Sequence, residues 1–348
     1  MSESIEAYMN SLLTTGVNWN QAIKVVEQAK YRFAKLIGAE PNEIAVLCSV
    51  SDIFSTIASS LSFEKGKNII VTTDMDFPTA GHVWLAQEKF GAKVRFIPSQ
   101  QGVIPLEYYE RYVTSDTLVT SISHVCYYNG FKQDLKAIAD IVHRKGSLLF
   151  VDAYQSAGQV PIDVKKMDID ILAAGTRKYL LGIPGISFLY IKAELAEKWK
   201  PRVTGWFGQE DHSKFNVHQI IPAAGTRRFE TGTPSFISAY AAAAAIRLLL
   251  EIGVENISSY LNLLAQFALD YGQEKGLHTV TPLSAHKRGG ITAFYVKNAG
   301  QIESILKERN IIVSARNDVI RIAPHFYNTQ DDIRQAIDEL TTVLTANK

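Results

Sequence analysis

The chain has 348 residues, of which 47% are hydrophobic, so it can bury a substantial core and disorder is excluded as its main state. Lysine and arginine total 36 against 35 aspartate and glutamate residues, and a net charge of +1 gives no general attraction to nucleic acid or to an anionic membrane. The longest apolar run, from Ala239 to Ile246, is far shorter than the ~18 residues of a transmembrane helix. Because the N-terminal segment carries Glu3 and Glu6 where a secretory signal carries lysine or arginine, we expect a cytoplasmic protein.

Short β-branched segments alternate with helical patterns over the first two thirds of the chain, which predicts parallel strands joined by helices. The strands are expected near Ile44–Cys48, Asn68–Thr72, Lys93–Pro98, Thr117–His124, Ser147–Val151, Asp170–Ala174 and Ile186–Ile191. Between them, Asp134–His143 places its apolar side chains on one helical stripe, which predicts a helix packed on the sheet. Leu148–Val151 and Ile169–Ala173 are apolar on both faces, so we expect these strands at the centre.

The pattern changes after Pro234. An alanine-rich helix is expected over Ala239–Leu250, ended by Gly253, and a second helix reaches about Tyr271. The elements that follow are strands near Ile291–Val296, Ile311–Ser314 and Val319–Ala323, with helices over Ile302–Arg309 and Gln330–Leu344. We therefore predict an α/β protein with a large domain, 16–245, and a smaller α+β domain made of 246–348 together with 1–15.

In open parallel sheets, ligands bind at the carboxyl ends of the strands. The side chains of interest that follow the expected strands are Ser51, Phe77, Tyr127, Asp152, Gln155 and Lys178. Together they offer a helix N-terminus, an aromatic surface, a carboxylate and an amine, which suit the phosphate, ring, pyridinium nitrogen and aldehyde of pyridoxal phosphate. No GxGxxG follows a strand and no GxxxxGK[ST] occurs, so dinucleotide and P-loop sites are disfavoured. The cysteine and histidine spacings give no support to a metal site.

Four segments resemble a known family. They are VDAYQSAGQVPIDV, DIDILAAGTRKYLLGIPGISFLYI, RRFETGTPS and VIRIAPHFYNT. In this order they are similar to the motifs of class V aminotransferases, the group that contains cysteine desulfurases, kynureninases and isopenicillin-N-epimerase-like proteins. The resemblance implies a fold type I pyridoxal-phosphate enzyme, with a mostly parallel sheet, flanking helices and a smaller C-terminal domain. It also implies a homodimer whose active sites lie at the subunit interface.

The resemblance assigns roles to single residues. Lys178 is implied to be the Schiff-base lysine, Asp152 the partner of the pyridinium nitrogen, and Gln155 a donor to the phenolic oxygen of the ring. Thr233 matches the residue that reaches the phosphate from the other subunit, and Arg321 matches the arginine that holds the substrate α-carboxylate. The other expected cofactor-binding residues are Val50, Ser51, Phe77, Tyr127, Thr176 and Arg177, and the other expected substrate-binding residues are Arg316, as a reserve for Arg321, and Trp206.

Each assignment has a structural alternative. Gln155 and Thr233 have the side chains that commonly satisfy turn backbone, and an edge strand would give Arg321 a role in solubility only. Tyr154 also departs from the family pattern, because relatives carry a small alanine behind the ring.

Several reactions remain open. The first choice is an aminotransferase that acts on an α-amino acid through an aldimine with Lys178. A lyase of the kynureninase or C–S lyase kind is suggested by the FPT and GWFG segments, an epimerase is a further alternative, and a short N-terminus motivates a catalytically silent protein of this fold. A desulfurase needs a cysteine nucleophile in the C-terminal third, and no cysteine follows Cys126. We expect Cys126 to pack as a small hydrophobic residue.

Overall fold

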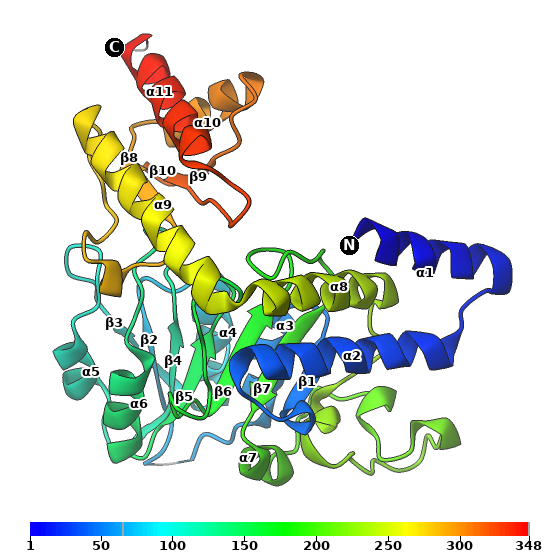
Figure 1. The fold of residues 1–348 in the computed structure, drawn as a ribbon. Helices are drawn as coiled ribbons and strands as arrows, with labels where there is room; N and C mark the ends of the chain where they lie inside the picture. Colours follow the sequence, from blue (N-terminus) through cyan, green and yellow to red (C-terminus); the bar gives the residue numbers. More distant parts are fainter. Residues whose placement is uncertain (65, 347–348) are drawn as a thin grey trace.

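The computed structural model describes residues 1–64 and 66–346, and its centre is a seven-stranded sheet (Figure 1). The strands are β1 (Ile44–Leu47), β2 (Ile69–Thr73), β3 (Lys93–Ile97), β4 (Thr117–Ser123), β5 (Leu148–Asp152), β6 (Ile171–Gly175) and β7 (Ser187–Ile191). Their order is β1-β7-β6-β5-β4-β2-β3, so the expected central position of β5 and β6 is confirmed. The expected mostly parallel sheet is confirmed, and the exception is β7, which runs antiparallel to both neighbours. The segment between β6 and β7 contains no helix, and a parallel pair needs a long crossover.

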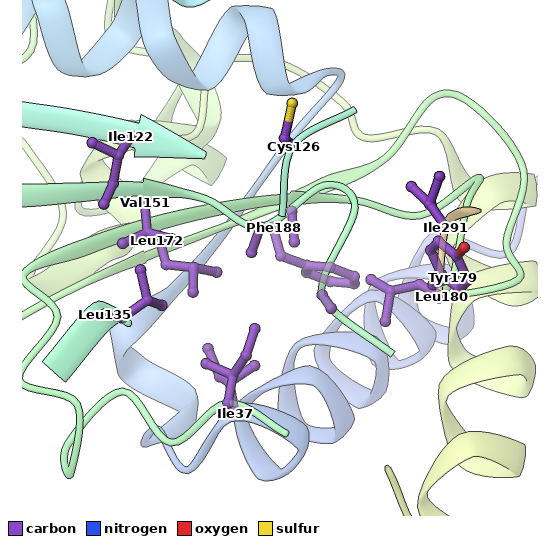
Figure 2. Close-up of a cluster of buried hydrophobic side chains, with 14 of the residues drawn as sticks. Ile37, Ile122, Cys126, Leu135, Val151, Leu172, Tyr179, Leu180, Phe188 and Ile291 are labelled. Atoms are coloured by element: carbon purple, nitrogen blue, oxygen red, sulfur yellow. The ribbon is translucent and has the colours of Figure 1, made fainter. Parts of the chain in front are cut away.

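Helices cover both faces of the sheet. They are α2 (Trp19–Ile37), α3 (Val50–Ser60), α4 (Pro78–Leu85), α5 (Leu106–Tyr112), α6 (Leu135–Arg144), α7 (Ala193–Lys198) and α8 (Phe236–Ile252). The next helix, α9 (Val254–Glu274), leads away from the large sheet and packs against the C-terminal unit (Figure 1). Alternate strand residues enter two separate apolar clusters, one shared with α2, α6 and α8 and the other with α3 and α4. Figure 2 shows the first cluster, in which Leu135 of α6 and Ile37 of α2 lie beneath Val151, Leu172 and Phe188 of the sheet. Burial on both faces explains the continuous apolar runs of the central strands.

The C-terminal unit is a three-stranded antiparallel sheet with two helices. Its elements are β8 (Thr292–Tyr295), α10 (Ala299–Glu308), β9 (Ser314–Arg316), β10 (Val319–Ile322) and α11 (Gln330–Ala346), and the strand order is β8-β10-β9. The strand expected over Ile311–Ser314 begins only at Ser314, because Ile311 is buried in the core behind α10 and residues 314–316 pair with β10. The last two residues of the expected domain, 347–348, lie outside the described residues.

The first helix, α1 (Ser2–Thr15), packs against α8. The Ser4 Oγ donates a hydrogen bond to the Tyr240 carbonyl at 3.1 Å, and the rings of Tyr8 and Tyr240 lie 5.1 Å apart. In Figure 1 this helix lies beside α8 and away from the C-terminal sheet. These contacts do not support grouping 1–15 with the C-terminal unit.

Among the described residues, no single helix is both long and apolar enough to cross a membrane. The pair α8 and α9 meets the length and composition requirement only jointly, with a bend of 80° between the two helices. Most of the alanines of α8 are buried against the rest of the protein, so their apolar character is explained by the core.

Candidate active site

A pocket of about 240 Å³ opens at the carboxyl ends of the central strands, where the C-terminal hairpin β9–β10 meets the large sheet. Most of the expected site residues line it together. The lining residues are Ser49, Val50, Ser51, Phe77, Thr79, Ser123, Val125, Tyr127, Asp152, Tyr154, Gln155, Arg177, Lys178, Arg316 and Arg321. The order of the strands brings together segments that lie as far apart in sequence as residues 50 and 321.

Lys178 follows β6, and its ammonium group lies among aromatic rings. The Nζ is 4.3 Å from the centre of the Tyr154 ring and 5.8 Å from that of Phe77. Burial lowers the pKa of Lys178 to about 8, the carboxylate of Asp152 opposes this shift, and the positive charge of Arg321 adds to it. A lysine with this pKa has a sizeable uncharged fraction near neutral pH, as a nucleophilic amine or a general base requires.

Asp152 is the last residue of β5 and is 9% exposed. Its Oδ1 accepts a hydrogen bond of 2.8 Å from the Tyr154 backbone N–H, which fixes the carboxylate at the strand end. Burial raises the pKa of Asp152 to about 6, against the lowering effects of this hydrogen bond and of Lys178. A buried carboxylate of this kind is stabilised by a cation or by an N–H donor placed in the pocket.

The N-termini of α3 and α4 meet on another side of the pocket. The Ser49 side chain caps α3 by accepting from the Asp52 N–H at 3.1 Å, so the first turn begins with Val50 and Ser51. The Ser51 and Thr79 hydroxyls lie 3.1 Å apart. Two helix N-termini and two hydroxyls suit a phosphate group. Thr79 was missed in the sequence, although Pro78 at the start of α4 marks the helix N-terminus that carries it.

Arg321 lies on β10, the central strand of the C-terminal sheet, and is 7% exposed. This placement excludes a role in edge solubility. Its Nη1 donates to the Tyr127 carbonyl, whereas its buried Nε has no partner in the part of the chain that the structure describes. A buried unpaired guanidinium N–H in a pocket is well suited to a carboxylate ligand.

A model of the aminotransferase class-V family matches residues 3–339. The chain belongs to this family. It is 50% identical over 343 residues to the "Uncharacterized aminotransferase YcbU" of Bacillus subtilis (strain 168), covering 98% of this chain and 90% of that protein. It is 28% identical to a kynureninase of Deinococcus radiodurans, over 90% of this chain and 77% of the other. A probable cysteine desulfurase of Pyrococcus abyssi is 27% identical, over 94% of this chain and 86% of that protein.

Solved structures confirm the fold expected for this family. The apo cysteine desulfurase of Thermococcus onnurineus NA1 superposes with a TM-score of 0.88 at 23% identity, over 99% of this chain and 92% of that one. The cystine C–S lyase C-DES gives a TM-score of 0.89 at 22% identity, over 97% of this chain and 93% of that one. The α/β architecture is therefore that of the fold type I pyridoxal-phosphate enzymes.

Three of the expected site residues lie outside this pocket. The Thr176 hydroxyl faces the backbone, 2.7 Å from the Ile183 carbonyl and 3.1 Å from that of Ile186, so it holds the loop before β7 instead of a phosphate. Trp206 lines a separate cavity. Thr233 is exposed at the surface of the single chain. Sequence position beside a motif does not tell which way a side chain points.

Asp76, which the sequence analysis missed, supports the pocket by joining two strand ends. Its carboxylate accepts hydrogen bonds from the Thr72 hydroxyl and the Thr73 N–H, each at 2.8 Å, and from the Ser123 N–H at 2.5 Å. These contacts tie the end of β2 to the end of β4 and so fix the loop that carries Phe77. Its position after β2 and directly before Phe77 was the sequence signal that could have identified it.

Proposed function

We propose that this class-V family member is a pyridoxal-phosphate-dependent aminotransferase that acts on an α-amino acid. The observation that carries the proposal is one pocket that joins Lys178, Asp152 and a buried, unpaired Arg321 Nε. The 50% identical relative is named an aminotransferase, and a C-DES structure is described as holding glycine covalently linked to its pyridoxal-phosphate cofactor.

The residues of the pocket fit pyridoxal phosphate. The N-terminal turn of α3, with Val50 and Ser51, and the Thr79 hydroxyl suit its phosphate, and Arg177 adds a positive charge. The exposed Phe77 ring offers a surface for the cofactor ring, and the Gln155 amide faces the same pocket. Bound there, the cofactor would supply an electrophilic carbon and a conjugated ring that delocalises negative charge from the substrate α-carbon.

Asp152 and Lys178 would divide the proton chemistry. The Asp152 carboxylate would hold the proton of the ring nitrogen, because an N–H⁺ donor compensates a charge that burial otherwise disfavours. Lys178 would form the covalent bond to the cofactor. Its free amine would take the substrate α-proton and deliver it to the cofactor carbon on the far side of the shared nitrogen, two bonds from the α-carbon, since its pKa of about 8 lies close to neutral pH.

Arg321 would orient the substrate. Its Nη1 is held by the Tyr127 carbonyl, which leaves the Nε side of the guanidinium for the α-carboxylate. Fixing the carboxylate determines which face of the α-carbon meets the Lys178 amine, so binding and proton transfer depend on the same contact.

The cysteines support an aminotransferase over a desulfurase. Cys126 is buried, its Sγ donates to the Met75 carbonyl at 3.4 Å, and burial raises the pKa of its thiol to about 11. A thiol of this kind is a poor nucleophile. Cys48 is exposed and directly follows β1, and no cysteine follows Cys126. The desulfurase relatives are also far more distant in sequence than the aminotransferase.

A homodimer with shared sites is part of the proposal. Thr233 is exposed and outside the pocket of its own chain, which is compatible with a role in the pocket of a second copy. Mixing Lys178→Ala chains with Thr233→Val chains should restore activity, because one site of each heterodimer then carries neither change. Activity that stays at the level of the separate variants would contradict a shared site.

The reaction is tested with the purified holoenzyme and one amino acid at a time. An aminotransferase should convert the yellow aldehyde form of the cofactor to the colourless amine form once and then stop, and a matching keto acid should restore the colour. Continuous release of a side-chain fragment would indicate a lyase, and inversion of the α-carbon without keto acid would indicate an epimerase. Either result would overturn transamination.

A further inference from the structure

The pocket carries more positive charge than the proposed cofactor and an α-carboxylate require. Its lining includes the cations Lys178, Arg177, Arg316 and Arg321, whereas Asp152 is the acidic residue that lines it. Within residues 1–64 and 66–346, none of the three guanidinium groups forms an ion pair with a carboxylate. Unpaired guanidinium groups gathered around a pocket indicate an anionic ligand.

The proposed function accounts for all of these charges except one. Arg177 is adjacent to Lys178 and serves the phosphate side, Asp152 serves the ring nitrogen, and Arg321 serves the α-carboxylate. Arg316 remains without a counter-charge, because its hydrogen bond goes to the carbonyl of its neighbour Ala315.

Arg316 is held over the pocket by the hairpin that carries it. It is the last residue of β9, and Asn317 turns the chain back with a positive φ of 51°. The next residue, Asp318, accepts a hydrogen bond of 2.5 Å from the Tyr128 hydroxyl, which fixes the tip of the hairpin to the loop after β4. The Arg316 side chain therefore starts from a backbone that is anchored at the edge of the pocket.

We propose that the substrates are α-amino dicarboxylic acids and the matching keto acids, with the α-carboxylate on Arg321 and the side-chain carboxylate on Arg316. The proposal rests on the proposed function, since it takes Arg321 as the α-carboxylate ligand. Arg316 and Arg321 line the same small pocket, so the second carboxylate is expected on a short side chain such as that of aspartate or glutamate.

The same charges disfavour neutral substrates. Arg316 and Arg321 are like charges that line one pocket, so they repel each other; burial and this repulsion both lower the pKa of Arg321. A ligand with one carboxylate, bound at Arg321, leaves the charge of Arg316 uncompensated, whereas a second carboxylate compensates it. Selectivity then comes from a penalty on the wrong ligand as well as from a contact with the right one.

The first test is binding to the holoenzyme, which does not depend on the reaction. Maleate and butyrate have the same number of carbon atoms but two carboxylates and one, and their affinities are measured by titration calorimetry. We expect maleate to bind more tightly, and Arg316→Gln to weaken maleate roughly ten- to hundredfold, the range for a charge-assisted hydrogen bond, with butyrate changed less than about threefold. Arg309→Gln is the matched control, because Arg309 pairs with Glu339 on the outside of the same unit.

The second test is the half-reaction with glutamate against glutamine, and aspartate against asparagine. The ratio of kcat/KM within each pair should favour the acid and should fall in Arg316→Gln by the factor found for maleate. Arg316→Lys keeps the charge without the planar fork, and an intermediate loss would exclude misfolding as the cause. Equal binding of maleate and butyrate, equal losses for acid and amide, or a faster reaction with phosphoserine would overturn the inference. A third outcome separates the two proposals. If maleate binding depends on Arg316 but no amino acid converts the cofactor to its amine form, the dicarboxylate site is supported and transamination is refuted.

Discussion

Gly175 makes room for the Tyr154 ring, and replacing Gly175 with alanine should push that ring out of its place. Gly175 ends β6, and a Cβ built there would lie 2.3 Å from Tyr154 Cζ, 2.6 Å from its Cε2 and 2.7 Å from its hydroxyl oxygen. Because all three distances are below any normal carbon contact, the ring of Gly175→Ala has to move by on the order of 1 Å. Lys178 Nζ lies 4.3 Å from the centre of the same ring, which lines the pocket, so the movement changes the surroundings of Lys178.

The expected cost follows from overpacking a rigid site. Inserting a methyl group into a well-packed region costs about 1–3 kcal/mol, which should appear in urea unfolding of the apoprotein. A cofactor bound in this pocket would meet the displaced ring, so its dissociation constant, measured by absorbance titration, should rise about tenfold, or roughly 1.4 kcal/mol. The large side chain of Tyr154 is therefore accommodated by the glycine at the end of the next strand.

A second substitution isolates the contact. In a Tyr154→Ala background the added methyl group meets no ring, so Gly175→Ala should lose most of its effect, and the coupling between the two changes should be at least about 1 kcal/mol. Gly300→Ala is the matched control, because a Cβ there meets nothing within 4 Å and the residue lies in α10. The reasoning is refuted if Gly175→Ala costs no more than Gly300→Ala, or costs the same with and without the Tyr154 ring.

Four further outcomes are expected. Borohydride reduction should fix the cofactor to Lys178, as read from a peptide map, and an adduct on another lysine would contradict the assignment. Arg321→Lys should keep the affinity for the cofactor but weaken the binding of amino acids by roughly thirtyfold or more, since truncation of a buried charge contact costs about 2–5 kcal/mol. Cys126→Ala should retain turnover; its loss in a folded, cofactor-loaded protein would revive sulfur transfer. Asp152→Asn should stabilise the apoprotein at pH 7 by up to roughly 3 kcal/mol, the difference between a pKa of about 6 and the ordinary 3.8, and the gain should vanish below about pH 4 because a protonated Asp152 carries no buried charge. An unchanged unfolding free energy at pH 7 would show that the carboxylate is better compensated than its burial implies.

The sequence predicted the large sheet well because its elements depend on local periodicity. Strand positions agree to within one or two residues, and the apolar stripe that marked α6 is buried as expected. The direction of β7 was not predictable in this way, since direction depends on what connects two strands and not on the composition of either. The start of β9 was misplaced because Ile311 reads as a strand residue but is buried behind α10.

The sequence predicted those pocket residues that come at or soon after the end of a strand. The topology rule found Asp152 and Lys178, and the resemblance added Arg321, whose burial on a central strand the sequence pattern left undecided. Thr176 was assigned wrongly because its hydroxyl is used by backbone carbonyls, a use that depends on the path of the following loop. Asp76 was missed because its three donors come from two different strands.

The two units of the protein contribute different parts of the proposed reaction. All the groups suited to the cofactor belong to the large sheet, whereas Arg316 and Arg321 belong to the C-terminal hairpin. The hairpin is fastened by two successive residues of one loop, through the Tyr127 carbonyl and the Tyr128 hydroxyl.

Beside them His325 accepts the Phe326 N–H at Nδ1, which leaves the proton on Nε2 for the Tyr179 carbonyl at 3.1 Å, one residue from Lys178. The carboxylate contacts are therefore positioned relative to Lys178 by short chains of hydrogen bonds. Loosening the C-terminal unit should weaken substrate binding before it weakens the cofactor.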